Sequence, residues 1–152
     1  MSDRPPYHRQ ETEYSCGAAC LRMVLEHLQL IRTEAELRAL TDSEFESAFY
    51  PGGATALRLV DAARQLGFLN STKENLEFQE LLWALSQGHF PIVYIAISLR
   101  PNTPLQSHAV VITEISEQGV RMLDPVRGEV THAVEEFNAM WRLRRGLTIL
   151  IS

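Results

Sequence analysis

Residues 91–125, which read PIVYIAISLRPNTPLQSHAVVITEISEQGVRMLDP, decide the fold class of this chain. Ile92 to Ile97 is a short apolar run, rich in β-branched residues and bounded by prolines, which predicts a buried strand. Two further strands are expected at Ala109 to Ile115 and at Val120 to Leu123, separated at the spacing of a hairpin. Throughout this stretch the sequence therefore has β rather than helical character.

The residues before this stretch follow the periodicity of amphipathic helices. Ser15 is a candidate N-cap for the first helix, and Thr33 with Glu36 forms the capping box of the second. The expected helices run from about Cys16 to Leu28, Thr33 to Leu40, Ala54 to Leu66, Phe78 to Ser86 and, after the hairpin, Glu136 to Trp141. A turn is expected at Pro51-Gly52-Gly53, and a closing strand at Leu147 to Ile151. We therefore expect an α+β fold in which N-terminal helices pack on a C-terminal antiparallel sheet.

The composition is that of an ordinary globular protein. The chain has 152 residues, of which 45% are hydrophobic and 22% charged, and we expect a single domain over residues 1–152. With 14 basic and 19 acidic residues the net charge is −5, and no run of Lys or Arg is present to follow a phosphate backbone, so no nucleic-acid partner is expected. The absence of a signal region and of an apolar run near ~20 residues predicts a soluble cytoplasmic protein without a membrane partner.

Two cysteines offer candidate thiols. Cys16 lies at the expected N-terminus of a helix, where the partial positive charge favours a thiolate, and Gly17 leaves the approach to it open. These features predict a nucleophile, although a buried, inert thiol is the alternative for any free cysteine. Cys20 lies one turn deeper without polar neighbours and is expected in the core. Four residues apart on one helix, the two thiols are not expected to form a disulfide, which fits a reducing cytosol.

A nucleophilic thiol needs a base, and His108 is the best placed of the five histidines. His108 directly precedes one strand of the expected hairpin, and Asp124 ends the other, so the two residues meet within two or three positions of register. Asp124 is then the carboxylate that orients the imidazole, although an aspartate before a proline is also an ordinary turn residue.

The other histidines are less suitable as the base. His27 lies at the far end of the first helix, about 16 Å from Cys16 at 1.5 Å of rise per residue. His8 and His132 are expected to be solvated, and His89 belongs to the turn before a strand.

Gln10 lies six residues before Cys16. Its side-chain amide and the Cys16 backbone N–H are two donors suited to the oxyanion of an acyl transfer, while an isolated glutamine is also a common surface residue. A zinc site built from Cys16, Cys20 and His108 is an alternative of a different class. Because cysteines at this helical spacing lack the turn that usually joins paired Cys ligands, we expect no metal and no cofactor.

Residues 10–20, QETEYSCGAAC, resemble the start of the bacteriocin-processing, or double-glycine-leader, cysteine peptidases of the papain-like superfamily. The likeness continues along nearly the whole chain through Thr33 to Leu40, Gly53 to Phe68, Leu81 to Val93, His108 to Val111, Asp124-Pro125 with Gly128, and Glu136-Phe137 with Trp141. The resemblance implies a papain-like cysteine peptidase fold with Cys16 as the nucleophile and His108 as the base. It also implies that Asp124 orients His108 and that Gln10 lines the oxyanion hole.

The resemblance further implies a cysteine endopeptidase that cleaves after a Gly-Gly pair, in a leader peptide or a target protein. Family members usually form part of a membrane exporter, and because the chain stops at Ser152 we expect a separate exporter as a partner. One alternative is a free-standing interbacterial toxin effector, delivered into another cell and countered by an immunity protein. Others are a catalytically silent peptide-binding module, an acyltransferase or a deamidase. Gly52-Gly53 would also offer such a peptidase a site for self-cleavage.

Overall fold

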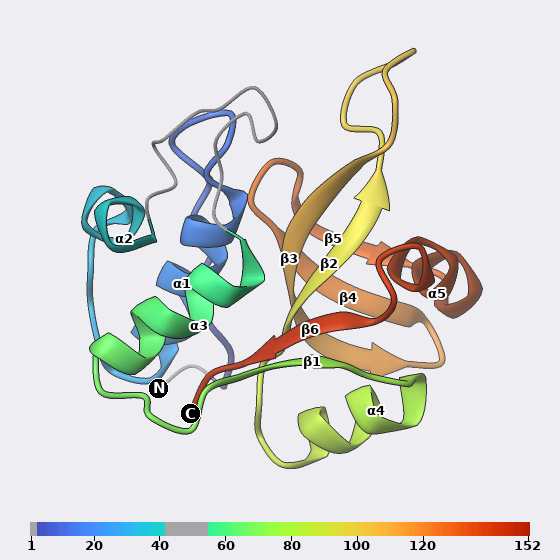
Figure 1. Ribbon diagram of the computed structural model, residues 1–152. Coiled ribbons are helices and arrows are strands. Elements are labelled where there is room, and N and C mark those ends of the chain that lie inside the picture. The colour runs from blue at the N-terminus through green and yellow to red at the C-terminus, as the bar shows by residue number, and fades with distance from the viewer. Residues whose placement is uncertain (1–2, 42–54) are drawn as a thin grey trace.

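The computed structural model describes residues 3–41 and 55–152, in which a sheet lies between two groups of helices (Figure 1). The helices are α1 (Cys16–His27), α2 (Glu34–Thr41), α3 (Ala56–Gln65), α4 (Phe78–Ser86) and α5 (Val134–Arg142). The strands are β1 (Thr72–Asn75), β2 (Ile92–Ile97), β3 (Gln106–Ser116), β4 (Gly119–Asp124), β5 (Gly128–His132) and β6 (Leu147–Leu150). They form one sheet in the order β1-β6-β2-β3-β4-β5, and each neighbouring pair is antiparallel.

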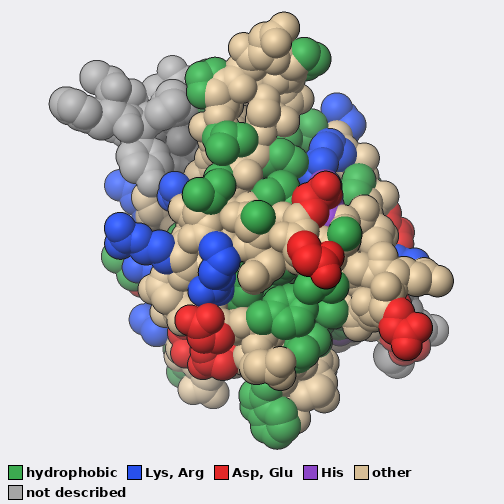
Figure 2. Space-filling model, turned by 90° about the vertical axis from the view of Figure 1, so that its right-hand side faces the viewer, with side chains coloured by type: hydrophobic (Ala, Val, Ile, Leu, Met, Phe, Trp, Pro, Cys, Tyr) green, Lys and Arg blue, Asp and Glu red, His purple; other side chains and the backbone are tan. Residues whose placement is uncertain are grey.

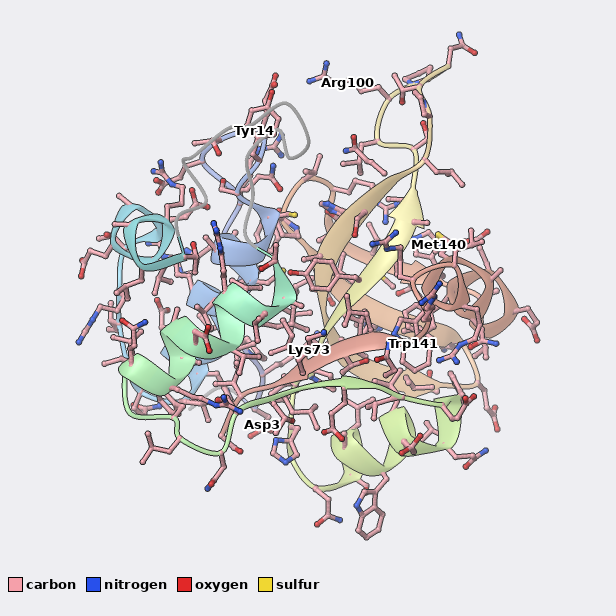
Figure 3. The ribbon with its side chains drawn as sticks, in the orientation of Figure 1. Asp3, Tyr14, Lys73, Arg100, Met140 and Trp141 are labelled. Carbon is pink, nitrogen blue, oxygen red and sulfur yellow. The ribbon has the colours of Figure 1, made fainter. Side chains whose placement is uncertain are left out.

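The sheet is the middle layer because both of its faces are buried. Along β2, Ile92 and Tyr94 pack in one apolar cluster and Val93 and Ile95 pack in the other, as the two-residue repeat of a strand requires. The first cluster contains the apolar faces of α1, α2 and α3, and the second contains those of α4 and α5. Trp141 is fully buried in the second cluster and lies between α5 and β6 (Figure 3). Each large apolar side chain buried in this way stabilises the fold by about 1.5–3 kcal/mol.

The predicted α+β class and most of the expected elements are confirmed. The bounds of α4 and β2 are those expected from the sequence. The capping box starts α2, since the Glu36 N–H donates to the Thr33 hydroxyl at 3.1 Å and the Thr33 N–H donates to the Glu36 carboxylate at 3.4 Å. α3 begins two residues later than expected, after its N-cap Thr55. The expected turn and the self-cleavage site at Gly52-Gly53 lie outside the described residues.

The two edge strands of the sheet are absent from the sequence-based prediction. β1 has the sequence TKEN and is mostly exposed, so it shows no apolar alternation. β5 contains Val130 as its only large apolar residue and alternates between half-buried and exposed positions. Polar edge strands are a common way to prevent sheet-to-sheet aggregation, and they carry little of the hydrophobic signal on which strand prediction depends.

The predicted capping role of the Ser15 side chain is wrong. Ser15 occupies the N-cap position of α1, but its side chain makes no capping hydrogen bond to the helix. Its hydroxyl instead accepts the Thr12 N–H at 3.0 Å. A serine hydroxyl bonds equally well to a nearby loop amide, and here that loop leads directly into Cys16.

The surface on the side of α5 carries a mixture of side-chain types. Basic and acidic side chains are interspersed with apolar ones across this face (Figure 2). Within residues 3–41 and 55–152, no helix has both the length and the apolar content needed to span a bilayer.

The turn between β3 and β4 predicts the effect of one substitution. Gly119 has φ +125°, and a Cβ there would collide with the backbone carbonyl of His132 in β5. We expect Gly119→Ala to lower the free energy of unfolding by about 2–4 kcal/mol, because backbone strain and the collision add. Chemical denaturation measures this loss.

Gly88→Ala is the matched control. Gly88 also has a positive φ, of +87°, but a Cβ there meets nothing within 4 Å. Its substitution should therefore cost only the backbone strain, about 1 kcal/mol. Equal losses in the two variants would contradict the assigned contact between β4 and β5.

Candidate active site

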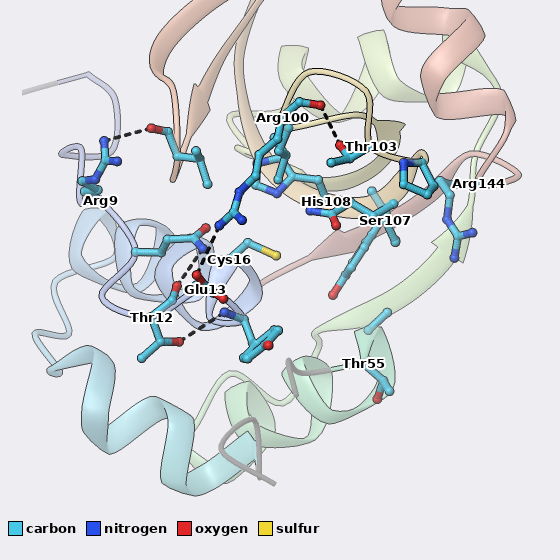
Figure 4. A pocket seen from close by; sticks show the side chains of 18 of the residues that line it. Arg9, Thr12, Glu13, Cys16, Thr55, Arg100, Thr103, Ser107, His108 and Arg144 are labelled. Atoms are coloured by element: carbon cyan, nitrogen blue, oxygen red, sulfur yellow. Dashed lines mark hydrogen bonds and ion pairs between the residues drawn. The ribbon is translucent and has the colours of Figure 1, made fainter. Parts of the chain in front are cut away.

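A cleft of about 970 Å³ opens between the N-terminal helices and the sheet. Cys16, the first residue of α1, lies in its lining together with Gln10 and His108 (Figure 4). The Cys16 side chain is partly exposed and its thiol is free. The backbone N–H groups of the first helical turn have no partner inside the helix, so the cleft receives both a thiol and the positive end of a helix dipole.

His108 lies between Asp124 and Cys16. Its Nε2 lies 2.7 Å from Asp124 Oδ1, and the Cys16 thiol is close enough to the ring to shift its pKa. Because Nε2 faces the carboxylate, Nδ1 is the nitrogen left for the sulfur. The structure therefore brings together three of the four predicted site residues in one line of contacts.

The register of the β3–β4 hairpin explains the meeting of His108 and Asp124. Val111 pairs with Leu123, so continuing the ladder by one step places Asp124 opposite Val110, two residues from His108. The offset predicted from the sequence is confirmed. Both side chains are buried, with 2% and 0% of their surface exposed.

Asp124 is held by several groups besides His108. Its Oδ1 accepts the backbone N–H groups of Val126 at 2.8 Å and Arg127 at 3.2 Å. Its Oδ2 accepts the Arg127 Nε–H at 2.6 Å, and the Tyr7 hydroxyl donates to the Asp124 carbonyl at 2.8 Å. The turn bonds follow from an aspartate that begins a tight turn, whereas nothing in the sequence relates Tyr7 to this site.

The contacts shift the pKa values of all three groups toward their charged forms, lowering those of Cys16 and Asp124 and raising that of His108. Burial raises the pKa of the Cys16 thiol, but the hydrogen bond and charge of His108 outweigh it, and the pKa lies below its ordinary value. Burial lowers the pKa of His108, but its hydrogen bonds to Asp124 and Cys16 raise it to about 9. Against the effect of burial, His108 holds the pKa of Asp124 far below its usual range. The shifts of Cys16 and His108 therefore both favour a thiolate beside an imidazolium.

Cys20 has the opposite environment. It is fully buried, and burial raises the pKa of its thiol well above the ordinary value, with the charge of Cys16 adding to the effect. The predicted core position of Cys20 is confirmed, and both thiols are free.

Gln10 lines the same cleft but uses part of its amide locally. Its Nε2 donates to the Thr12 carbonyl at 2.7 Å, and its backbone N–H donates to the Pro125 carbonyl at 3.0 Å. An amide nitrogen carries two N–H groups, so the bond to Thr12 leaves the second for a ligand. The Pro125 bond joins the loop before Cys16 to the turn after Asp124.

An ion pair joins the two sides of the cleft. Arg100, in the connection between β2 and β3, lies 3.2 Å from a carboxylate oxygen of Glu13, in the loop before α1. Figure 3 shows Arg100 on the sheet side and Tyr14 on the helical side of this opening. Both partners of the pair are about 70% exposed, so we expect it to contribute at most about 1 kcal/mol and to open readily.

The expectation that His8 and His132 are solvated is wrong. His8 is half-buried and lies 3.1 Å from Glu26. His132 is paired with Glu136 and also contacts Arg127 at 3.1 Å. The partner of His8 is 18 residues away, which the local sequence does not reveal, whereas both partners of His132 lie within five residues of it. Among the described residues, no group of three or more His, Cys, Asp or Glu side chains is arranged to hold a metal ion.

The source of the raised His108 pKa predicts the outcome of a titration. Replacing the carboxylate in Asp124→Asn should lower the pKa of His108 from about 9 toward its ordinary value of about 6.5. NMR titration of the imidazole ring measures the change. Glu136→Gln, which removes the carboxylate beside His132, is the control and should leave His108 unchanged. A pKa that stays at about 9 in Asp124→Asn would contradict the assigned pairing.

Comparison with known proteins identifies the family of this chain. The model of the Peptidase C39 family matches residues 4–152. The Lactococcin-G-processing and transport ATP-binding protein LagD of Lactococcus lactis subsp. lactis is 24% identical over 132 residues. These residues cover 87% of this chain but only 17% of LagD, so the chain spans about one sixth of that relative.

Two solved structures share the fold. One is a double glycine motif protease from an AMS/PCAT transporter in complex with the leader peptide, with a TM-score of 0.74, 21% identity and coverage of 99% of this chain and 94% of that chain. The other is the peptidase domain of Streptococcus ComA, with a TM-score of 0.73, 24% identity and coverage of 95% and 96%. They confirm the papain-like α+β architecture. The match over nearly the whole sequence shows that the chain belongs to the Peptidase C39 family and is a cysteine peptidase.

Proposed function

We propose that this chain cleaves the peptide bond that follows a Gly-Gly pair in the leader of a small peptide. The observation that carries the proposal is the position of His108, which contacts Cys16 on one side and Asp124 on the other, inside an open cleft. The relatives with this fold include a double glycine motif protease in complex with a leader peptide. A peptide substrate therefore suits both the chemistry of the cleft and its relatives.

In the proposed mechanism, Cys16 is the nucleophile and His108 transfers the proton. The thiolate attacks the carbonyl carbon of the scissile bond, and a C–S bond forms as the carbonyl π electrons move to oxygen. The imidazolium then donates its proton to the leaving amine as the C–N bond breaks, which leaves an acyl-enzyme. His108, now neutral, takes a proton from water, whose hydroxide equivalent attacks the thioester. Collapse of this second intermediate releases the acid and restores the thiolate–imidazolium pair.

Asp124 and Gln10 support this chemistry in two ways. The Asp124 carboxylate fixes the ring of His108 through Nε2 and favours the imidazolium form. The Gln10 amide and the Cys16 backbone N–H are the donors proposed for the oxyanion of each tetrahedral intermediate. Such donors typically contribute a factor of about 10²–10³ to kcat.

The shape of the cleft supports a preference for glycine beside the scissile bond. Glu13 and Arg100 meet across the opening in which Cys16 lies, and Tyr94 and Ala56 line the same space. A substrate chain that passes between these groups toward the thiol should fit best where it carries no side chain, as at glycine. We propose that this passage selects the Gly-Gly pair.

The name of one relative supports an exporter as the partner of this chain. LagD is named as a processing and transport protein, and this chain matches about one sixth of it. We propose that the peptide whose leader is cut here is subsequently exported, and that an exporter is the functional partner of this peptidase.

A comparison of the two cysteines tests the proposed nucleophile. Cys16→Ala should abolish cleavage of a leader-type peptide carrying a Gly-Gly site, because no other thiol contacts His108 among the described residues. Cys20→Ala, the matched control one helical turn away, should cleave at a rate close to that of the unaltered chain and lose only stability, since a small cavity opens in the core. Chromatography with mass detection measures the products. Cleavage by Cys16→Ala would contradict the proposal.

A further inference from the structure

A buried carboxylate that takes no part in this mechanism lies one layer behind the cleft. Glu34, the first residue of α2, has 1% of its side chain exposed. Burying an ionised group is costly unless its charge is compensated. Both carboxylate oxygens accept the backbone N–H of Glu11, each at 3.1 Å, and Arg38 lies 3.3 Å from Oε2.

The contacts of Glu34 are directed at the loop that precedes Cys16. Glu11 immediately follows Gln10, whose own N–H is held by the Pro125 carbonyl at 3.0 Å. Two consecutive amides of this loop are thus held by two different segments, one by the turn after Asp124 and one by a carboxylate on α2. The side chain of Gln10 emerges between these two anchors.

A second set of contacts fixes the side chain of Glu11. Its carboxylate lies 3.5 Å from Arg22 of α1 and 3.4 Å from Arg38 of α2. Arg38 therefore bridges Glu34 and Glu11. Burial leaves the pKa of Glu34 above its ordinary value, although the Glu11 N–H and the Ser15 hydroxyl lower it in part.

We propose that Glu34 is a positioning residue for the oxyanion hole, holding the Glu11 amide so that Gln10 presents its side chain beside Cys16. This inference rests on the oxyanion role of Gln10 in the function proposed above. In Glu34→Gln, an NH2 group replaces one of the two oxygens that accept the Glu11 N–H. A hydrogen-bond donor of the side chain then faces the N–H donor of the backbone. The loop should then shift, and Gln10 should lose its alignment.

Two reactions of the same thiol separate this role from a general loss of structure. Alkylation by iodoacetamide displaces iodide at a saturated carbon and develops no oxyanion, so it depends on the Cys16–His108 pair alone. Peptide hydrolysis passes through a tetrahedral oxyanion and depends on Gln10 as well. Misplacing only the Gln10 amide should therefore slow hydrolysis and leave alkylation unchanged.

The experiment measures kcat and KM for a Gly-Gly leader peptide and the rate of Cys16 alkylation, using the full chain at neutral pH. We expect Glu34→Gln to lower kcat by about 10-fold or more, a part of the ~10²–10³ attributed to an oxyanion donor, with alkylation changed by less than about twofold. Gln10→Ala should show the full loss, and the double variant should lose no more than Gln10→Ala alone, because both substitutions remove one function. Glu36→Gln, on the exposed side of α2, is the control and should keep kcat.

Each contrary result has a distinct meaning. Unchanged kcat in Glu34→Gln, a parallel loss of hydrolysis and alkylation, or a double variant whose loss is the product of the single losses would overturn the proposal. Unaltered kcat in Gln10→Ala would overturn the oxyanion role itself, and the anchoring by Glu34 with it. If Glu34→Gln does not fold, Glu34→Asp keeps the charge on a shorter arm and is judged by the same comparison of hydrolysis with alkylation.

Discussion

The site depends on the hydrogen bond between His108 Nε2 and Asp124 Oδ1, which is 2.7 Å long and buried at one end of a hairpin. The surrounding structure must satisfy the hydrogen-bonding groups that this buried pair leaves over. A buried charged pair is stable only if its remaining hydrogen-bonding capacity is satisfied. Here the turn after Asp124 supplies two backbone amides and Arg127 supplies a guanidinium. The register of β3 against β4 sets the offset of the pair, and the apolar layers on both faces of the sheet hold that register.

The helices on the other side of the cleft supply the thiol and hold the loop that precedes it. α1 presents Cys16 to the imidazole, and the loop before it is tied to the Asp124 turn through the Pro125 carbonyl and to α2 through Glu34. Few of these contacts bury much apolar surface. Their effect is on orientation, since acyl transfer depends on placing a thiol, a base and an oxyanion donor around one carbonyl group.

The parts of this arrangement that the sequence predicts are those governed by local periodicity. The hairpin follows from alternating apolar residues, and it brings His108 to Asp124 because strand pairing leaves little freedom. The place of Cys16 at a helix N-terminus follows from the helical repeat after Ser15. In the same way, the core position of Cys20 follows from the apolar residues around it.

The parts that escape prediction are contacts between segments distant in the sequence. Glu34 appears in the sequence as one acidic residue of an ordinary first helical turn, and only the packing of α2 against the loop at Glu11 makes it a buried anchor. His8 and Glu26 are 18 residues apart, so nothing in the local sequence pairs them. β1 and β5 lack apolar alternation and become strands only because β6 and β4 offer them open edges.

The ionised state of Cys16 is the central claim, and the pH dependence of its alkylation by iodoacetamide tests it most directly, with the modified residue identified by peptide mass spectrometry. The lowered pKa of Cys16 predicts that modification at this residue reaches half of its maximal rate below about pH 8.5, the ordinary value for a free thiol. His108→Ala should move this midpoint upward. A midpoint at or above about 8.5, or equally fast modification of Cys20, would contradict the account.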